Sequence, residues 1–392
     1  MRRGADPRVG HADRATDAGE TLTSKEQRDG ERVAVRAAAT AAKRQADTER
    51  TVRQEQLAEE HRRAAEAVAA KAYEHYLQVR EWARQMREVE GAKAPQTAAE
   101  EQMIQGLEHL WHATPETIAS LRRWCEPISG LRATDYEPGL EESALPIRRE
   151  LGVLWRQVGR ALFVPESPAL GGFGYEKRGE LYNEDTLRFF TALAALDDAA
   201  VLGEFRGTSR RRVVWEIGGG WGGFAYHFKT ACPNVTYLIT GAPDLFLVSA
   251  VYLMTLYPGA RCCFYDAAAP DELWRDWQEI DFIFAPESAI GSLRLPQLDL
   301  TLDLMALRNM TAARRCAHVQ HAFDTGSRYF YSILPTRHLA EGPSTVWSAI
   351  ERFYWPHPVA PRRDERVLVV SAEEPLSEPS FAHLVGWRRI RV

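Results

Sequence analysis

The chain has 392 residues, a formal net charge of −5 and 45% hydrophobic residues, which allows one large core with appendages and gives no electrostatic reason to expect nucleic acid. Its five cysteines are odd in number and include no C-x-x-C pair, which favours a reducing compartment and argues against a structural zinc site. Residues 1–29 lack the apolar core of a signal peptide, and the longest apolar stretch, 245–257, is too short to span a bilayer, so we expect a cytoplasmic protein.

The N-terminal part of the chain predicts helices without a sheet. Residues 1–30 are polar and charged, which is typical of a disordered tail. Residues 31–95 are rich in Ala, Arg, Glu, Gln and Lys, and their apolar positions recur three or four residues apart, which predicts a charged helical arm with a narrow apolar stripe. A solvated helix is the simpler interpretation of this arm, and self-association or docking through it is the alternative. Residues 96–170 predict a helical cap, with helices at 98–113, 115–125 and 146–163.

Residues 171–392 predict a Rossmann-like α/β domain with a doubly wound, mostly parallel sheet. After a helix at 183–196, strands and helices alternate, which indicates a parallel sheet covered by helices. The predicted strands are residues 213–217, 235–239, 261–265, 281–284, 299–304, 328–333 and 367–371. The predicted helices between them are residues 224–231, 245–256, 270–278 and 312–323. Ligands of such sheets bind beyond the carboxyl ends of the strands.

The most informative segment runs from Val213 to Gly223, an apolar strand that contains Glu216 and ends in a dense run of glycines. A carboxylate inside such a strand is costly unless a partner satisfies it, and the glycines let the backbone turn sharply against a ligand. Strand, glycine turn and helix together hold nucleotide-like cofactors; a turn without a ligand is the alternative. The spacing Gly218-x-Gly220-x-x-Gly223 also fits a dinucleotide fingerprint, but the next strand lacks the acid that such a site requires.

The register Glu216-x-Gly218-x-Gly220-x-Gly222 resembles the first motif of class I S-adenosylmethionine-dependent methyltransferases. The longer run Glu-Ile-Gly-Gly-Gly-Trp-Gly-Gly-Phe-Ala is similar to the sugar O-methyltransferase family of that class, and softer matches extend over roughly residues 170–340. The resemblance implies S-adenosylmethionine as the cofactor and a small-molecule sugar or glycoside as the acceptor.

The same resemblance implies roles for residues of the glycine turn. Glu216 would face the ammonium group of the cofactor's methionine part, and Gly218, Gly220 and Gly222 would bring bare backbone against the cofactor. Trp221 is either a wall of the cofactor site or a side chain packed against the entry helices.

Cofactor residues outside the turn are less regular. The family closes the second strand with an acid that accepts hydrogen bonds from both ribose hydroxyls, and this chain has Gly241 there. Thr240 and Asp244 are the residues expected to substitute for it. Asp266, after the third strand, is expected near the adenine.

Methyl transfer to a hydroxyl requires alignment of the reacting atoms and can use a general base. Asp303, at the end of the fourth main strand, and His338, in the loop after the fifth, are the predicted catalytic residues, and His227 is a third candidate. A capping or solvated acid is the alternative for Asp303. Where the family has Ser and Glu after the fourth strand, this chain has Ala306 and Asn309. No compact Asp/Glu/His cluster predicts a metal.

Two functions from different classes therefore stay open. One is an S-adenosylmethionine-dependent O-methyltransferase acting on a sugar hydroxyl or a glycosylated small molecule. The other is a degenerate methyltransferase fold that serves as a binding or scaffold protein, which the departures at Gly241, Ala306 and Asn309 favour. A dinucleotide-dependent oxidoreductase is a third interpretation.

Overall fold

The computed structural model describes residues 17–90, 97–137, 139, 144–293, 295, 297–335, 345–359 and 381–390. The chain divides into two compact units, Met1–Glu66 and Ala67–Val392. Two features expected from the sequence, the strand at 367–371 and the catalytic candidate His338, lie outside the described residues.

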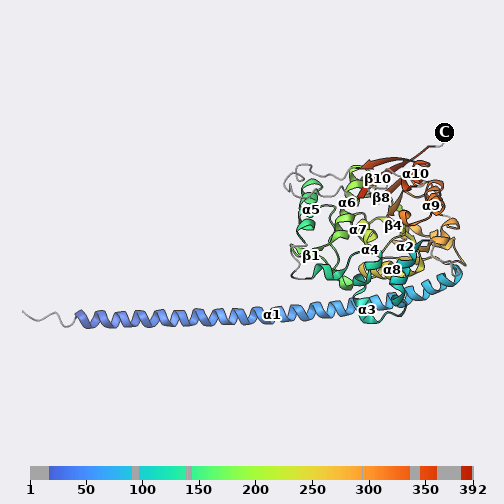
Figure 1. Cartoon of the computed structure of the whole chain (residues 1–392). Coiled ribbons are helices and arrows are strands. Elements are labelled where there is room, and N and C mark those ends of the chain that lie inside the picture. The colour runs from blue at the N-terminus through green and yellow to red at the C-terminus, as the bar shows by residue number, and fades with distance from the viewer. Residues whose placement is uncertain are drawn as a thin grey trace, which may run out of the picture. The chain divides into compact units, whose positions relative to one another are not determined.

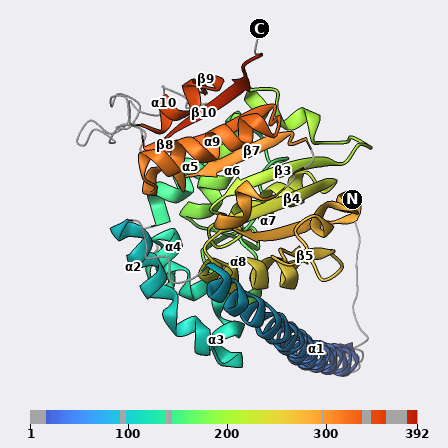
Figure 2. The same ribbon diagram turned by 90° about the vertical axis from the view of Figure 1, so that its right-hand side faces the viewer.

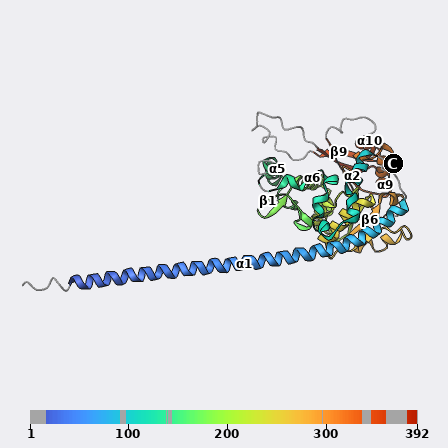
Figure 3. The ribbon, with the colours of Figure 1, turned by 60° about the horizontal axis from the view of Figure 1, so that its bottom comes forward.

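Helix α1 (Asp17–Glu90) runs without interruption (Figures 1 and 3). It begins inside the segment expected to be a tail, so residues 17–30 are helical. Within the first unit its described side chains are mostly exposed and bury no core. Local ion pairs support this helix: Arg62 Nη2 lies 2.5 Å from Glu59 Oε2, and Arg63 Nε lies 2.9 Å from Glu59 Oε1.

The end of α1 belongs to the core of the second unit. Ala72, Tyr76, Val79 and Ala83 are fully buried. The hydroxyl of Tyr76 donates to the carbonyl oxygen of Leu110 at 2.7 Å. The apolar stripe read from the sequence is therefore a packing surface from residue 72 onward, whereas the sequence analysis assigned it to the arm up to residue 95.

Within the described residues, the central sheet has eight strands in the order β5-β6-β4-β3-β7-β8-β10-β9 (Figure 2). The first six in this order are parallel, and β10 is antiparallel to both of its neighbours, β8 and β9. The predicted doubly wound, mostly parallel α/β fold is thus confirmed. The strands are β3 (Arg212–Ile217), β4 (Val235–Gly241), β5 (Cys262–Phe264), β6 (Phe282–Pro286), β7 (Leu300–Leu304), β8 (Tyr329–Pro335), β9 (Tyr354–Val359) and β10 (Phe381–Arg388).

Strand β3 is buried on both faces, as its apolar sequence predicts. Val214 belongs to the core cluster that contains α6 (Glu184–Asp198), α7 (Gly223–Ala231) and α8 (Pro243–Leu256). Val213, Trp215 and Ile217 belong to the cluster that contains α9 (Ala312–Asp324) and α10 (Val346–Glu351). Because side chains alternate along a strand, Glu216 points to the same face as Val214.

Short helices precede the sheet in the second unit. They are α2 (Ala98–Leu107), η1 (Glu108–His112), α3 (Pro115–Ala119), η2 (Leu121–Trp124), α4 (Glu126–Ser129), η3 (Ala133–Tyr136), α5 (Ala144–Gln157) and η4 (Ala169–Gly171). A hairpin of β1 (Tyr175–Lys177) and β2 (Glu180–Tyr182), which the sequence analysis missed, lies between this cap and α6.

One predicted helix is wrong. Residues 270–278 form two separate 3₁₀ turns, η6 (Glu272–Trp274) and η7 (Trp277–Glu279), and not an α-helix. Their hydrogen bonds join residues three apart, as in Arg275 N–H to Glu272 O at 3.2 Å, so the segment is too short and too tightly wound for an α-helix. The remaining 3₁₀ turns are η5 (Leu202–Glu204), η8 (Glu287–Gly291) and η9 (Leu307–Asn309). In the described part of the chain, no helix has the length and apolar character needed to cross a membrane.

Candidate functional site

The chain reverses its direction of strand addition at β3. Strand β4 pairs with one side of β3, and β7, which follows later in the sequence, pairs with the other. The carboxyl ends of strands at such a reversal form a crevice where ligands bind. The glycine turn, residues 218–222, fills the space between β3 and α7 at this place.

The glycine turn has a backbone that only glycine adopts without strain. Gly218, Gly219, Gly220 and Gly222 have φ angles of 86°, 44°, 51° and 87°. A Cβ atom at Gly219 would overlap a methyl group of Ile239. At Gly220 an added Cβ would meet Ile128 at 3.6 Å, an ordinary contact, so the turn there presents bare backbone toward α4.

A cavity of about 200 Å³ lies at this end of the sheet. Its floor includes the backbone of residues 218–220 and the ends of β3, β4 and β7, while α2 and α4 contribute residues opposite the turn. Ligand pockets usually measure roughly 300–1,000 Å³. The covering residues, which narrow the cavity below that range, are Ala99, Glu100, Met103, Ile128 and Ser129.

Glu216 lines this cavity and is only 3% exposed. The hydroxyl of Tyr237 donates to its Oε2 at 2.9 Å. Burial raises the pKa of the Glu216 carboxyl to about 7, against the opposing hydrogen bond from Tyr237. A cation placed next to Glu216 would therefore restore its charged form and would itself be bound.

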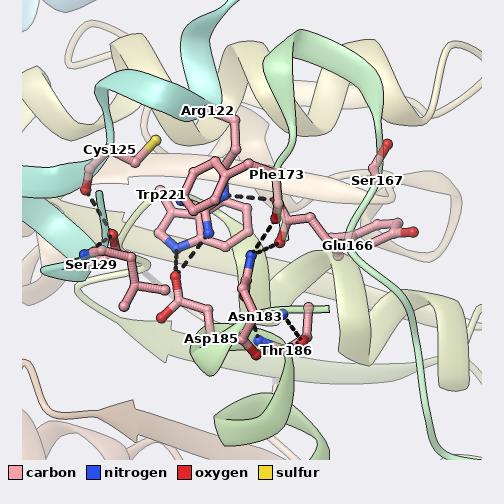
Figure 4. Close-up of polar contacts among 12 residues, drawn as sticks. Arg122, Cys125, Ser129, Glu166, Ser167, Phe173, Asn183, Asp185, Thr186 and Trp221 are labelled. Atoms are coloured by element: carbon pink, nitrogen blue, oxygen red, sulfur yellow. Dashed lines mark hydrogen bonds and ion pairs between the residues drawn. The ribbon is translucent and has the colours of Figure 1, made fainter. Parts of the chain in front are cut away.

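The side chain of Trp221 contacts a buried cluster of ion pairs (Figure 4). Arg122 is fully buried, and its Nε donates to Glu166 Oε1 at 2.8 Å and its Nη2 to Asp185 Oδ2 at 3.0 Å. The indole N–H of Trp221 donates to the same Asp185 oxygen at 3.1 Å, and the guanidinium lies 3.8 Å from the Trp221 ring centroid. Trp221 also lines the cavity. Trp221 is thus a packed side chain that also lines the cavity, and its contact with a cofactor stays a prediction.

Arg122 stays charged in this cluster. Burial lowers the pKa of the guanidinium, but the neighbouring carboxylates of Glu166 and Asp185 outweigh that effect, and the net shift is upward. Asn183 donates from Nδ2 to Glu166 Oε2 at 3.0 Å, which satisfies a further acceptor. Two of the three guanidinium nitrogens of Arg122 are thus paired, while Nη1 is buried and has no hydrogen-bond partner among the described residues.

The three predicted cofactor residues outside the glycine turn do not line the cavity. Thr240 is buried, and its hydroxyl accepts a hydrogen bond from the Trp215 indole at 2.9 Å. Asp244 is buried between Trp111, whose indole donates to it at 3.0 Å, and the guanidinium of Arg87. Asp266 is exposed and follows β5, which β6 separates from β4, so it is displaced from the cavity by one strand.

Of the three predicted cofactor glycines, two line the cavity and one does not. Gly218 and Gly220 line the cavity together with Gly219, which the sequence analysis did not single out. Gly222 faces α8, where an added Cβ would lie 3.1 Å from the carbonyl oxygen of Ser249.

The catalytic candidates that the structure describes lie outside the cavity lining. Asp303 is fully buried below the cavity, where its Oδ1 accepts from the Leu307 N–H at 2.9 Å and its Oδ2 from the Ser332 hydroxyl at 2.6 Å. Burial raises the pKa of Asp303 to about 6, against these hydrogen bonds. His227 is fully buried against Phe189, and burial, with nearby Arg122, lowers its pKa to about 3. Asp303 therefore braces a turn, in line with the capping alternative.

Among the charged residues that line the cavity and that the sequence analysis missed, three are joined by ion pairs. Glu287 follows β6 and pairs with Arg314 of α9, and Arg314 Nη1 lies 3.1 Å from Glu100 Oε2 of α2. Burial raises the pKa of Glu287, but hydrogen bonds from Arg314 and His318 outweigh it and bring the pKa to about 2. The rule that ligands bind beyond the carboxyl ends of strands could have found Glu287, which follows β6. Nothing in the sequence indicates that α2 lies beside α9.

Among the described residues, no group of three His, Cys, Asp or Glu side chains is arranged to hold a metal ion.

No family model matches the chain, and no curated protein matches it in sequence. Among solved structures, the methyltransferase domain of bacterial CtHen1 is 12% identical, with 52% of this chain and 100% of that chain covered and a TM-score of 0.33. EvdMO1 is 17% identical, with 62% and 48% covered and a TM-score of 0.32. DhpI, in complex with SAH, is 13% identical, with 51% and 88% covered and a TM-score of 0.29. Similarity at this level says nothing about chemistry, which has to be argued from the cavity itself.

Proposed function

We propose that the chain is an S-adenosylmethionine-dependent methyltransferase whose methyl donor binds in the cavity at the end of β3. The observation that carries this proposal is Glu216, a nearly inaccessible carboxyl that lines the cavity beside a turn of bare backbone. Burying a carboxylate costs free energy unless a cation compensates it. Among the described residues, Tyr237 gives Glu216 a hydrogen bond and no cationic side chain pairs with it. The ammonium group of an amino-acid ligand supplies the missing charge.

The cavity residues fit this donor in chemistry. Glu216 would hold the ammonium group, and the backbone of residues 218–220 would lie against the amino-acid end. Gly241 lines the cavity without a side chain, but its neighbour in the sheet register is Pro286, and the next residue, Glu287, brings a carboxylate to the same place. Glu287 is therefore the residue we assign to the ribose hydroxyls, in place of Thr240 and Asp244.

We propose that α2 and α4 move away from the glycine turn when the donor binds. At about 200 Å³ the cavity is smaller than usual ligand pockets, because α2 and α4 pack over the glycine turn. When bound, S-adenosylmethionine supplies an electrophilic methyl group on a positively charged sulfur. The tasks of this chain are to orient the acceptor oxygen and to keep water away.

The acceptor that we propose is a sugar hydroxyl or a glycosylated small molecule, which rests on the resemblance of the glycine run. The acids lining the cavity other than Glu216 are held in ion pairs: Asp185 with Arg122, and Glu287 and Glu100 with Arg314. A base for the hydroxyl proton must therefore come from elsewhere, and His338 keeps that role as a proposal.

Calorimetric titration with S-adenosylmethionine and S-adenosylhomocysteine tests the donor site. We expect micromolar binding to the native chain, at least a tenfold loss in Glu216→Gln and at least a hundredfold loss in Gly220→Asp, which plants a carboxylate at the bare backbone. Gly259→Asp is the matched control, because an added Cβ at Gly259 has open space around it. Unchanged binding in Gly220→Asp would place the site elsewhere.

The second candidate is a scaffold protein built on the same fold. The small cavity and the missing side chain at Gly241 favour it, and binding of both ligands weaker than millimolar would favour it over catalysis. In that case the exposed part of α1 becomes the interaction arm, and light scattering of the chain with and without residues 1–66 shows whether copies associate through it.

A further inference from the structure

The charges around the cavity are mostly compensated by neighbours. Arg314 has carboxylates of both Glu287 and Glu100 beside it, and Arg188 Nη1 lies 2.9 Å from Asp185 Oδ1. Two charges stand apart. Glu216 has no cationic partner among the described residues, and Arg308, which lines the cavity and is exposed, forms no ion pair or side-chain hydrogen bond with them. The proposed donor compensates Glu216, which leaves Arg308 for a second ligand.

Arg308 stands on a turn whose backbone is held in place. This acceptor turn, Met305–Met310, connects β7 to α9 and lines the same cavity as the glycine turn. Arg315 Nε donates to the Leu307 carbonyl and Arg315 Nη2 to the Met310 carbonyl, both at 3.0 Å. Asp303 accepts the Leu307 N–H from below. The Cα position of Arg308 is therefore set before any ligand arrives.

The acceptor turn also holds strain. Met305 has a φ angle of +73°, which is costly for a residue with a side chain. Strained residues of this kind persist where the surrounding structure enforces them, and they concentrate at ligand sites. Met305 lines the cavity, and Ala306 next to it packs so closely on the glycine turn that a Cβ at Gly218 would lie 2.5 Å from its own Cβ. The acceptor turn and the glycine turn are therefore packed against each other at Ala306 and Gly218.

We infer that the methyl acceptor carries an anionic group, a carboxylate or a phosphate, and that Arg308 binds this group at the cavity rim. The inference rests on the proposed methyltransferase function and specifies its substrate class. A guanidinium presents paired N–H donors that match the oxygens of carboxylate and phosphate. Fixed at one end by Arg308, the acceptor is oriented toward the space between the two turns, which is the positioning that methyl transfer needs.

The test is a binding experiment on the full chain saturated with S-adenosylhomocysteine. Glucose, glucuronic acid and glucose 1-phosphate are titrated in low-salt buffer, because an exposed charge pair is screened by salt. We expect at least one acidic ligand to bind at least tenfold more tightly than glucose, and the comparison of the two acids tells a carboxylate from a phosphate. Arg308→Gln should abolish the preference, and Arg308→Lys should keep part of it.

The controls separate this inference from its premise. Arg210→Gln removes an exposed arginine at the amino end of β3, on the opposite edge of the sheet, and should leave all affinities unchanged. Arg308→Gln should bind S-adenosylhomocysteine as the native chain does. If S-adenosylhomocysteine does not bind the native chain, the proposed function fails. If it binds but the acids bind no better than glucose, or their preference survives in Arg308→Gln, the inference about the acceptor alone is overturned.

Discussion

The glycine turn and the acceptor turn, which line the same cavity, reach unusual backbone conformations by different means. The glycine turn has positive φ angles at four residues, and all four are glycines. The acceptor turn has a positive φ at Met305, which is not a glycine, and hydrogen bonds of Asp303 and Arg315 with the backbone of Leu307 hold the same turn. The glycine turn has its conformation because its own residues are glycines. The acceptor turn has no glycine, and its backbone is held by side chains from outside the turn. The two turns should therefore respond differently to substitution.

The largest effect is expected from Gly219→Ala. The new Cβ would overlap a methyl group of Ile239, and the alanine would have a φ angle of 44°. Backbone strain and overpacking would therefore both destabilise the fold. We expect a loss of about 2–5 kcal/mol in the free energy of unfolding, measured in urea. Gly203→Ala is the control, because an added Cβ meets nothing there and φ is not positive. A loss below about 0.5 kcal/mol would mean that the glycine turn is not fixed by its residue types.

A second effect concerns Glu216 and pH. Its pKa rises from an ordinary 4.5 to about 7 on folding, so the folded protein holds the proton more tightly. Stability from this group is complete below pH 4.5 and is lost as pH rises through 7, by roughly 3 kcal/mol at most. Urea unfolding between pH 4.5 and 8 should show this decline, and Glu216→Gln should remove it. In the native chain, S-adenosylhomocysteine should bind more tightly as pH rises over the same range, which Glu216→Gln should also abolish.

Asp303→Ala tests the bracing of the acceptor turn. It leaves the buried Leu307 N–H and the Ser332 hydroxyl without their acceptor, at a cost of about 1–3 kcal/mol. Asp303→Asn keeps one acceptor oxygen and should cost less. If the turns are independent, Asp303→Ala weakens binding of the acidic ligands while the affinity for S-adenosylhomocysteine stays the same. Equal loss of both ligands would contradict the contrast between the turns.

The smallest effect is expected from Glu100→Gln, which weakens the ion pair between α2 and Arg314. The pair is partly exposed, so its contribution to stability should stay below about 1 kcal/mol. Because α2 covers the cavity, its release should speed association of S-adenosylhomocysteine several-fold in stopped-flow measurements. Glu101→Gln, an exposed neighbour on the same helix, is the control. An unchanged association rate would show that α2 does not limit entry.

Much of the fold could be predicted from local sequence patterns. The features that could not be predicted depend on contacts between segments that lie far apart in the sequence. The buried strand, Glu216 and the glycine turn were predictable because their residue types set their conformation and burial. Trp221 was ambiguous because its partners, Arg122 and Asp185, come from two other helical segments. Asp266 is displaced because β6 lies between β5 and β4, and strand order depends on packing across the whole sheet. The burial of residues 72–86 depends on a docking surface that the helix sequence does not contain.

The docked end of α1 also affects whether the edge of the sheet can pair with a further strand. The indole N–H of Trp82 donates to the carbonyl of Tyr265, and its ring packs 4.9 Å from that of Phe264, so a helix covers part of the outermost strand β5. At the opposite border, β9 carries Pro356 and Pro358, which have no N–H to offer. Both rims are thereby poor templates for a further strand. Copies of this protein should therefore resist aggregation by pairing of these two sheet edges.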